Sequence, residues 1–296
     1  MDMHKMLVGI CAYNEENNIG KLLRNLISEQ NLPDNCKIVV VCSGCTDKTP
    51  QIVNDFQRID KRITAIVEKV RKGKANALNK IFGIARRNAG ILVLVNADAL
   101  PKEGSIKKLV LKLLHTNAGA VFARPVPLKE KHQGLCHKIV WVIWRLHHII
   151  SILQKPKLSG ELCAINTSYL QDIPEYIATD EPFIELNIRK QGSSIVYVPE
   201  AVVYIRCPTN IVDLLEHRKR IWIGHMQLQK TTGFKVSTSS VINIMSAIPT
   251  LSLSEIFYAF IGGIIEVIAY FRAKIAFTKG TVPYVWQPIT STKTLI

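Results

Sequence analysis

The stretch Ile91-Leu92-Val93-Leu94-Val95-Asn96-Ala97-Asp98 decides the fold, because it joins a continuous apolar run to polar side chains. An unbroken aliphatic run of this length is typical of a strand that is covered on both faces, as in a parallel sheet between helices. Such a strand carries Asn96 and Asp98 to its carboxyl end, and open α/β sheets bind their ligands at that edge. We therefore expect chemistry at Asp98, in an acidic motif from which one acid is missing.

Short β-branched runs alternate with longer amphipathic runs on both sides of this stretch, which is the pattern of βαβ units. The turns that lead from the strands into the helices are polar or contain Gly, so functional residues should gather in them. The fold class is α/β, with a mostly parallel mixed sheet flanked by helices. Strands are predicted at residues 6–12, 37–41, 63–68, 91–95, 120–123 and 194–199, and helices at 17–29, 49–58, 74–88 and 105–115.

The composition points to an anionic partner and away from a secreted protein. A formal net charge of +15 on 296 residues suits nucleic acid, nucleotide phosphates or an acidic membrane surface. The hydrophobic content of 48% and the mean hydropathy of +0.15 are high for so basic a chain, which favours a membrane surface over nucleic acid. The odd count of 7 Cys favours reduced thiols. Residues 1–6 lack the apolar run of a secretory signal, so we expect a cytoplasmic location.

Two apolar segments fit poorly inside the sheet. Residues 136–153 suit either an interfacial helix with aromatic anchors or an ordinary core helix. Residues 256–271 are more apolar but run just short of the roughly 20 residues that span a bilayer, and they include Glu266. Paired with residues 236–253 they would form a spanning hairpin, and otherwise they would lie on the membrane surface. Either arrangement predicts membrane-associated helices in the C-terminal region.

The turns after the first two strands carry side chains that suit a nucleoside. In Ala12-Tyr13-Asn14-Glu15 an aromatic ring can stack on a base and a carboxylate can accept ribose hydroxyls, although a simple turn before a helix capped by Asn17 is the alternative. Cys42-Ser43-Gly44-Cys45 has the spacing of a thioredoxin-like redox site. Thioredoxin-like domains are much smaller than this chain, so the Cys pair is interpreted as a neutral filler.

Lys72-Gly73-Lys74 opens a predicted helix, where a cation and free N–H groups suit a diphosphate; a solvated basic loop is the alternative. Taken in order, these motifs and Asn96-Ala97-Asp98 resemble those of the inverting family 2 glycosyltransferases, whose donor-binding domain has the fold called GT-A. The likeness runs from about residue 7 to residue 222, some three quarters of the chain.

The resemblance assigns a role to each of these motifs. It implies that Ala12, Tyr13, Asn14, Glu15 and Ser43 hold the nucleoside and that Lys74 holds the phosphates. Asn96-Ala97-Asp98 takes the place of the Asp-x-Asp motif that binds Mn²⁺ or Mg²⁺, with Asp98 as the metal ligand and Asn96 as a neutral carbonyl donor or a sugar ligand. A strand-end Asp that caps a turn before Pro101 is the alternative. Cys42, Ser43 and Cys45 replace residues that are usually acidic or Ser, so the base of a UDP- or GDP-sugar stays open.

The candidate catalytic base lies in Thr179-Asp180-Glu181-Pro182. The family usually has Thr-Glu-Asp, with the Asp as base and a Gly 11 positions later, and counting back from Gly192 gives Glu181. The two acids are transposed here, so either Asp180 or Glu181 is the candidate. Like-charge repulsion within such a pair can raise one pKa toward a useful value. Without the family context, Asp180 before Pro182 would be a helix N-cap.

Arg218-Lys219-Arg220-Ile221-Trp222 resembles the Gln-x-x-Arg-Trp segment of processive members, but the Gln is absent and the Trp is one residue late. Processive polymerisation is therefore not supported. Arg218 and Arg220 suit the leaving diphosphate or, alternatively, lipid headgroups.

The prediction is a metal-dependent, inverting glycosyltransferase on the cytoplasmic face of the cell membrane. It would move a sugar from a UDP- or GDP-sugar to a lipid-linked or glycan acceptor, and no nucleic-acid partner is expected. Residues 1–230 would form the GT-A domain and residues 231–296 a membrane-associated helical region and tail. A non-catalytic GT-A-like scaffold is the main alternative, because several motif positions depart from the family. A sugar nucleotidyltransferase is less favoured, because residues 6–16 lack its Gly-rich basic signature.

Overall fold

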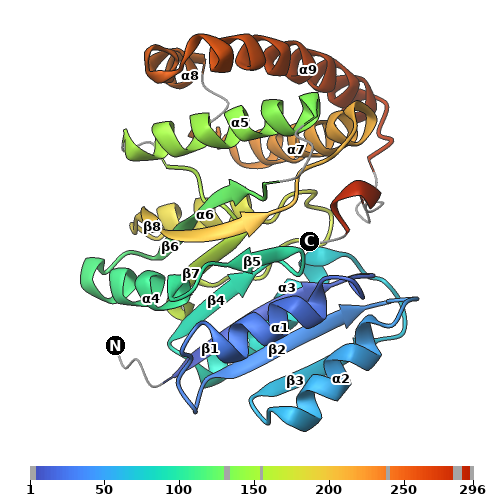
Figure 1. Cartoon of the computed structure of the whole chain (residues 1–296), viewed down its shortest axis with the longest axis vertical. Helices are drawn as coiled ribbons and strands as arrows, with labels where there is room; N and C mark the ends of the chain where they lie inside the picture. The colour runs from blue at the N-terminus through green and yellow to red at the C-terminus, as the bar shows by residue number, and fades with distance from the viewer. Residues whose placement is uncertain (1–4, 130–133, 154–155, 238–240, 283–288, 294–296) are drawn as a thin grey trace.

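A mixed eight-stranded sheet forms the centre of the protein (Figure 1). The computed structural model describes residues 5–129, 134–153, 156–237, 241–282 and 289–293. The strand order is β3-β2-β1-β4-β7-β6-β8-β5. β1 pairs in parallel with β2 and β4, and β2 with β3, whereas β7 runs antiparallel to both of its neighbours. The strands are β1 Met6–Ala12, β2 Lys37–Ser43, β3 Ile63–Glu68, β4 Ile91–Val95, β5 Ala99–Pro101, β6 Ala120–Pro127, β7 Leu162–Asn166 and β8 Ile195–Ile205.

The mostly parallel mixed sheet predicted from the sequence is confirmed, and the main differences lie at strand ends. The strands predicted at 120–123 and 194–199 are too short, because β6 and β8 stay paired beyond a bulge between Ala123 and Arg124. The helices are α1 Ile19–Ser28, α2 Thr49–Ile59, α3 Lys74–Asn88, α4 Ser105–Thr116, α5 Leu135–Ile152, α6 Glu181–Lys190, α7 Ile211–Thr232, α8 Val241–Ala247 and α9 Leu253–Thr278. Short 3-10 turns are η1 Thr167–Tyr169, η3 Ile248–Thr250 and η4 Thr290–Thr292.

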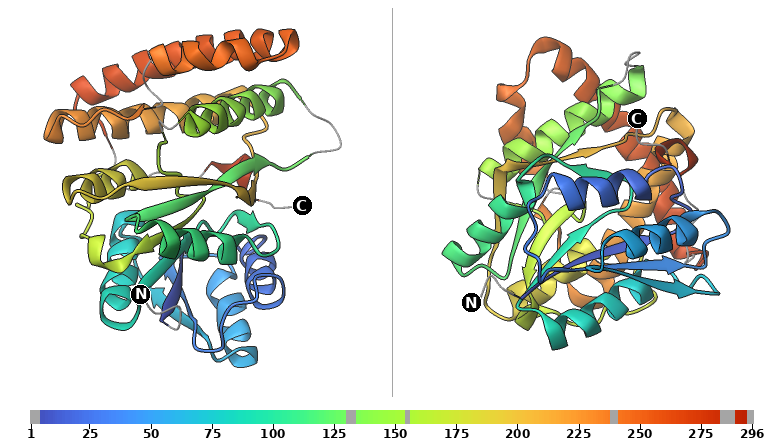
Figure 2. Two further views of the ribbon diagram at one scale, coloured as in Figure 1. Left: turned by 90° about the vertical axis from the view of Figure 1, so that its left-hand side faces the viewer. Right: turned by 60° about the horizontal axis from the view of Figure 1, so that its bottom comes forward.

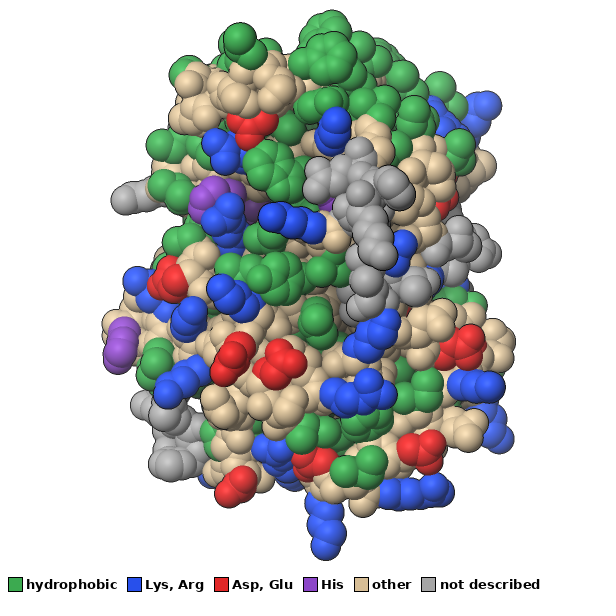
Figure 3. Space-filling view, viewed as in Figure 1, with side chains coloured by type: hydrophobic (Ala, Val, Ile, Leu, Met, Phe, Trp, Pro, Cys, Tyr) green, Lys and Arg blue, Asp and Glu red, His purple; other side chains and the backbone are tan. Residues whose placement is uncertain are grey.

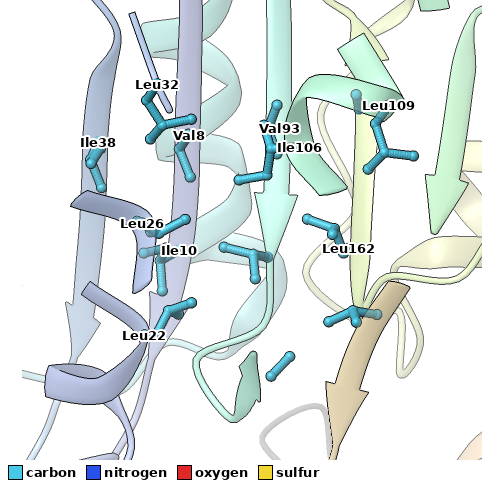
Figure 4. Close-up of a cluster of buried hydrophobic side chains, with 14 of the residues drawn as sticks. Val8, Ile10, Leu22, Leu26, Leu32, Ile38, Val93, Ile106, Leu109 and Leu162 are labelled. Atoms are coloured by element: carbon cyan, nitrogen blue, oxygen red, sulfur yellow. The ribbon is translucent and has the colours of Figure 1, made fainter. Parts of the chain in front are cut away.

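Two hydrophobic cores cover the two faces of the sheet, because successive side chains of a strand point to opposite faces. On one face, side chains of β1 and β4 pack against α1 and α4 (Figure 4). On the other face, alternate residues of the same strands pack against α3 and α6. The apolar runs at the centre of the sheet are therefore buried from both sides, which fixes the carboxyl ends of β1, β2 and β4 at one edge.

A layer of long helices lies beyond β6 and β8, where α9 packs across α5 and α7 (Figures 1 and 2). α5 has one side against β6 and another against α9, which agrees with the core-helix alternative for residues 136–153. α9 has 26 residues, more than predicted, and it is long and apolar enough to cross a membrane by length and composition.

The predicted spanning hairpin is wrong within the described residues. In the described part of the segment that was to pair with α9, the longest element is the 7-residue helix α8, and the short turn η3, which contains Pro249, follows it. Ser252 then caps α9, because its side chain accepts a hydrogen bond from the backbone N–H of Glu255. Residues 238–240 of that predicted segment lie outside the described residues.

Candidate active site

Asp180 and Glu181 meet Lys74 at the carboxyl edge of the sheet. Lys74 begins α3, and its Nζ lies 3.0 Å from Asp180 Oδ2 and 3.7 Å from Glu181 Oε1. Asp180 occupies the N-cap position of α6, but its side chain makes no capping hydrogen bond. Its carboxylate is therefore directed to Lys74 rather than to the helix, which a simple N-cap does not explain.

The two acids of this pair titrate in opposite directions. Burial and the neighbouring charge of Glu181 raise the pKa of Asp180 above its usual range, against the opposing charge of Lys74. Burial also acts to raise the pKa of Glu181, but the charges of Lys74, Lys157 and Arg220 and a backbone hydrogen bond together lower it. Of the two acids, Asp180 is thus the one whose pKa lies above its usual value.

The loop that holds this pair is clamped from two sides. A Cβ atom on Gly160 would lie 2.4 Å from Glu181 Oε1, and one on Gly224 would lie 2.2 Å from Thr179 Oγ1. The side-chain carbonyl of Gln227 in α7 accepts a hydrogen bond of 2.9 Å from the backbone N–H of Ala178. These close approaches fix the position of the acids, as a reacting centre requires.

Asp98, the predicted metal ligand, lies directly after β4 and faces two further carboxylates. Among the described residues its own carboxylate has no hydrogen-bond or ion-pair partner, although its charge raises the pKa of its neighbours. Burial first, and then the charge of Asp98, raise the pKa of Glu15 to about 7. The same causes in the same order raise the pKa of Glu161 to about 7. Three carboxyl groups therefore share this part of the edge.

Sequence reasoning missed Glu161, which the antiparallel pairing of β4 with β7 brings beside Asn96. Asn96 Nδ2 donates a hydrogen bond of 2.9 Å to Glu161 Oε2, and the backbone N–H of Asn96 donates to the carbonyl of Glu161 at 3.2 Å. The sequence around it offers only a Gly turn before a strand of small residues, in residues 158–165, and that pattern does not single out Glu161. Its approach depends on strand register, which no local pattern reports.

Sequence reasoning also missed Lys293, near the C-terminus. Its Nζ donates a hydrogen bond of 3.0 Å to the backbone carbonyl of Tyr13 and forms an ion pair with Glu15. The adjoining Ser291 holds the segment in place by bonding the Asp213 carboxylate at the start of α7. The tail thus returns from the helical layer to the predicted nucleoside site.

The predicted nucleoside residues divide into a contact surface and a scaffold. The guanidinium of Arg71 lies 3.6 Å from the ring centroid of Tyr13, and Ala12 is buried at the end of β1. Asn14 ties the first loop to the second, because its amide donates to Thr46 Oγ1 at 3.1 Å and accepts from the backbone N–H of Thr46 at 2.9 Å. Ser43 is buried at the end of β2. In this structure Asn14 acts as part of the scaffold.

The two predicted phosphate arginines are not brought together. Arg220 lies near the acids, since its charge interacts with Asp180, Glu181 and Asp98. Arg218 instead forms an ion pair with Glu266 of α9, and it faces the helical layer. Of the two, Arg220 is the one positioned for an anionic ligand at the sheet edge.

A family model for Glycosyl transferase family 2 matches residues 7–173. The chain belongs to this family. An uncharacterized protein of Methanocaldococcus jannaschii is 31% identical over 219 residues, which cover 68% of this chain and 92% of that protein. The probable glycosyltransferase YdaM of Bacillus subtilis is 32% identical over 127 residues, which cover 42% of this chain and 30% of the relative.

Solved structures of glycosyltransferases share the fold. The mannosyltransferase PcManGT of Pyrobaculum calidifontis, in complex with GDP-Man and Mn²⁺, has a TM-score of 0.63 at 20% identity, over 97% of this chain and 82% of that one. TarS 1-349 of S. aureus, in complex with UDP-GlcNAc, has a TM-score of 0.54 at 14% identity, over 93% of this chain and 92% of that one. The GT-A fold predicted for this chain is confirmed.

The oxygen donors at the edge suit a hard divalent cation. Within the described ranges no group of three or more His, Cys, Asp or Glu side chains is arranged to hold a metal ion by itself. Asp98 and the amide carbonyl of Asn96 are oxygen donors of the kind that Mn²⁺ and Mg²⁺ take in proteins. The residues therefore fit an ion that completes its coordination with oxygens of a bound diphosphate.

Proposed function

We propose that this protein is a membrane-associated, metal-dependent, inverting glycosyltransferase. Its donor would be a UDP- or GDP-sugar and its acceptor a hydroxyl or phosphate on a lipid-linked or glycan molecule. The observation that carries the proposal is the position of Asp180, a buried acid of raised pKa, at the same sheet edge as Asp98, which forms no ion pair with any described residue. Neighbours of the same fold in complex with GDP-Man and Mn²⁺ or with UDP-GlcNAc support a nucleotide-sugar donor.

Each residue of the edge has a defined task in this reaction. Asp180 accepts the proton of the acceptor hydroxyl as the acceptor oxygen attacks the anomeric carbon. The bond from that carbon to the diphosphate breaks on the opposite face, which inverts the configuration. Arg220 and Lys74 stabilise the negative charge that grows on the departing diphosphate. When bound, Mn²⁺ or Mg²⁺ would supply Lewis-acid neutralisation of the diphosphate beside Asp98.

The outer face of α9 supports membrane attachment. Phe257, Phe260, Val267 and Phe271 follow one another at helical spacing, and each is more than half exposed. Figure 3 shows hydrophobic side chains gathered over α8 and α9, whereas charged side chains are common over the sheet. A contiguous apolar stripe of this kind on one helix is typical of a surface that lies in a lipid interface.

The inner face of α9 favours an in-plane attachment over a spanning helix. Three ion pairs spread along its length join it to the rest of the protein: Glu255 with Arg145, Glu266 with Arg218, and Arg272 with Glu216. A bilayer-spanning position would carry some of these charges into the hydrocarbon core, which is costly. We infer that α9 lies along the membrane surface and that the phenylalanines of its outer face point into the lipid.

A donor screen tests the proposal. Purified protein is incubated with a panel of UDP- and GDP-sugars and a membrane lipid extract, with Mn²⁺ or with a chelator, and transfer is followed by mass spectrometry. Transfer from one donor class that needs the metal supports the proposal. Metal-dependent donor binding without hydrolysis or transfer would instead indicate a non-catalytic scaffold. Activity that survives both Asp98→Ala and the double change Asp180→Asn, Glu181→Gln would overturn the assignment of the site.

A further inference from the structure

The strand-end motif Asn96-Ala97-Asp98 has one carboxylate where two would bind a divalent cation more firmly. Each lost carboxylate removes a formal charge and an oxygen donor from such a site. Asn96 keeps an oxygen donor but is neutral. The charge that is missing at position 96 must come from elsewhere in the chain if the site holds its ion with two acids.

The sheet supplies an acid at that place from a neighbouring strand. β4 and β7 pair antiparallel, with Val95 opposite Leu162, so the next residues along, Asn96 and Glu161, lie beside each other. The side-chain hydrogen bond of 2.9 Å from Asn96 Nδ2 to Glu161 Oε2 joins them directly. The carboxylate of Glu161 therefore lies next to Asn96, the residue that replaces the first acid of the motif.

The contacts of Glu161 leave room for a cation beside its carboxylate. Within the part of the chain that the structure describes, its carboxylate has the Asn96 amide as its hydrogen-bond partner and forms no ion pair, and Asp98 forms none either. Both acids lie at the same end of β4. The two carboxylates repel each other, and partial burial strengthens that repulsion, of which the charges of Lys74 and Arg220 offset a part. A divalent cation between them removes it.

We propose that Glu161 supplies the second protein carboxylate of the divalent-cation site, in place of the acid that is absent at position 96. This inference rests on the proposed function, because it concerns the ion that accompanies the nucleotide-sugar donor. Asn96 then acts as a positioning residue, since its amide holds the Glu161 carboxylate toward the end of β4. Glu181 packs against Gly160, the residue before Glu161, so the same segment links the ion site to the catalytic pair.

The test uses substitutions that move the carboxylate from Glu161, beside β7, to position 96, beside β4. Binding of Mn²⁺ is measured by the electron paramagnetic resonance signal of the free ion, with Mn²⁺ alone and with UDP or GDP present. Glu161→Gln should weaken Mn²⁺ binding about tenfold or more. The double change Asn96→Asp, Glu161→Gln returns the acid to the strand end and should restore affinity to within a few-fold of the wild type. A merely structural role of Glu161 would not be rescued in this way.

The control is Glu175→Gln, which removes an exposed acid that accepts a hydrogen bond from Asn76 of α3 and should leave Mn²⁺ affinity unchanged. If Glu161→Gln does not fold, Glu161→Asp carries the test, because it keeps the charge but withdraws it by one methylene and should weaken binding in the same direction. Wild-type affinity in Glu161→Gln, or a double variant that stays as weak as Glu161→Gln, would overturn the role of Glu161 and leave the proposed function standing. Wild-type protein that binds no Mn²⁺ with either nucleotide would overturn the metal dependence in both.

Discussion

Acidic side chains are treated differently at the sheet edge and in the helical layer. In the layer each acid of the α9 contacts has its own arginine: Glu266 with Arg218, Glu216 with Arg272, and Glu255 with Arg145. At the edge, a single lysine, Lys74, serves both Asp180 and Glu181, and Asp98 has no ion-pair partner among the described residues. Each acid of the layer thus has its own arginine, whereas the acids of the edge share their cations or, like Asp98 among the described residues, form no ion pair.

The difference separates a structural use of charge from a functional one. In a matched ion pair each charge is neutralised by its partner. Such pairs fix the position of α9 and need no ligand. Burial and then the charge of Asp98 raise the pKa of Glu15 and of Glu161 to about 7, and carboxylates in such a setting favour binding of a cation or a proton. Removal of an acid from the edge should accordingly lower catalytic activity. Removal of an acid from the layer should lower the thermal stability of the protein.

The largest effect is expected from Asp180→Asn. Loss of a general base typically lowers kcat by about 10²- to 10⁴-fold, and donor affinity should change little, because the amide keeps the shape of the side chain. Steady-state kinetics together with calorimetric donor titration measure both quantities. Asp172→Asn is the matched control, since this exposed acid pairs with Arg86 on the surface and should retain full activity. Wild-type kcat in Asp180→Asn would show that Asp180 is not the base.

The pH profile should show the raised pKa of Asp180. A base works only when ionised, so kcat/KM should fall as pH drops through its pKa, about tenfold per pH unit. Because burial and Glu181 raise that pKa, the acidic limb should lie at higher pH than the usual 3.8 of an Asp. The limb should disappear from the residual activity of Asp180→Asn. An unchanged limb in that variant would assign the titration to another group, and Glu15→Gln then tests the acid of pKa about 7.

The outer face of α9 is apolar, unlike the acidic sheet edge and the ion pairs of the layer. We expect this face to attach the protein to lipid. Phe257→Ser with Phe260→Ser removes two aromatic rings that are 59% and 69% exposed in the protein. Each buried ring contributes about 1.5–3 kcal/mol, so binding to vesicles should weaken at least tenfold. Vesicle flotation measures it, and Ile59→Ser, on α2, is the exposed control. Equal flotation of the double variant and the wild type would exclude this face as the attachment surface.

Much of the fold was predictable because it rests on local patterns. The run Ile91–Val95 is apolar throughout, as a strand covered on both faces is, and the turn that follows it carries the predicted Asp98. β5 was missed, since a three-residue strand next to Pro101 has no periodicity to detect. α9 was predicted too short because Glu255 and Arg272 bound its apolar run, and their partners on α5 and α7 are not neighbours in sequence.

The residues of the site also fall into those that local motifs predict and those that depend on contacts far apart in sequence. Asp98, Glu15 and Asp180 follow strands or precede a helix, so local motifs located them. Glu161 and Lys293 were missed, because one reaches the site through an antiparallel register and the other through the return of the tail. Arg218 was grouped with Arg220 from spacing alone, but helical geometry turns the two side chains in different directions.

A smaller effect is expected in the layer from Glu266→Gln. The change leaves Arg218 without its counter-charge and weakens the acceptor of the 2.8 Å hydrogen bond from Trp222 Nε1. Both charged side chains are partly exposed, so the cost should be about 1–3 kcal/mol rather than the full cost of a buried charge. Thermal unfolding measures it, and kcat should stay near the wild-type value. The double change Arg218→Met, Glu266→Met should recover stability, and a double variant no more stable than Glu266→Gln would contradict a matched pair.

Lys293→Met is expected to have the smallest effect, and it tests whether the tail lowers the pKa of Glu15 at the sheet edge. The ammonium of Lys293 lowers the pKa of Glu15 against burial and the charge of Asp98. Without it the pKa of Glu15 should rise above about 7, so the ionised carboxylate forms only at higher pH. If Glu15 accepts ribose hydroxyls, the pH dependence of donor affinity should shift upward by a fraction of a unit to about one unit. Lys230→Met is the control, because this cation lies near Phe277 in the helical layer and should leave the profile unchanged. A downward shift in Lys293→Met would contradict the ion pair with Glu15.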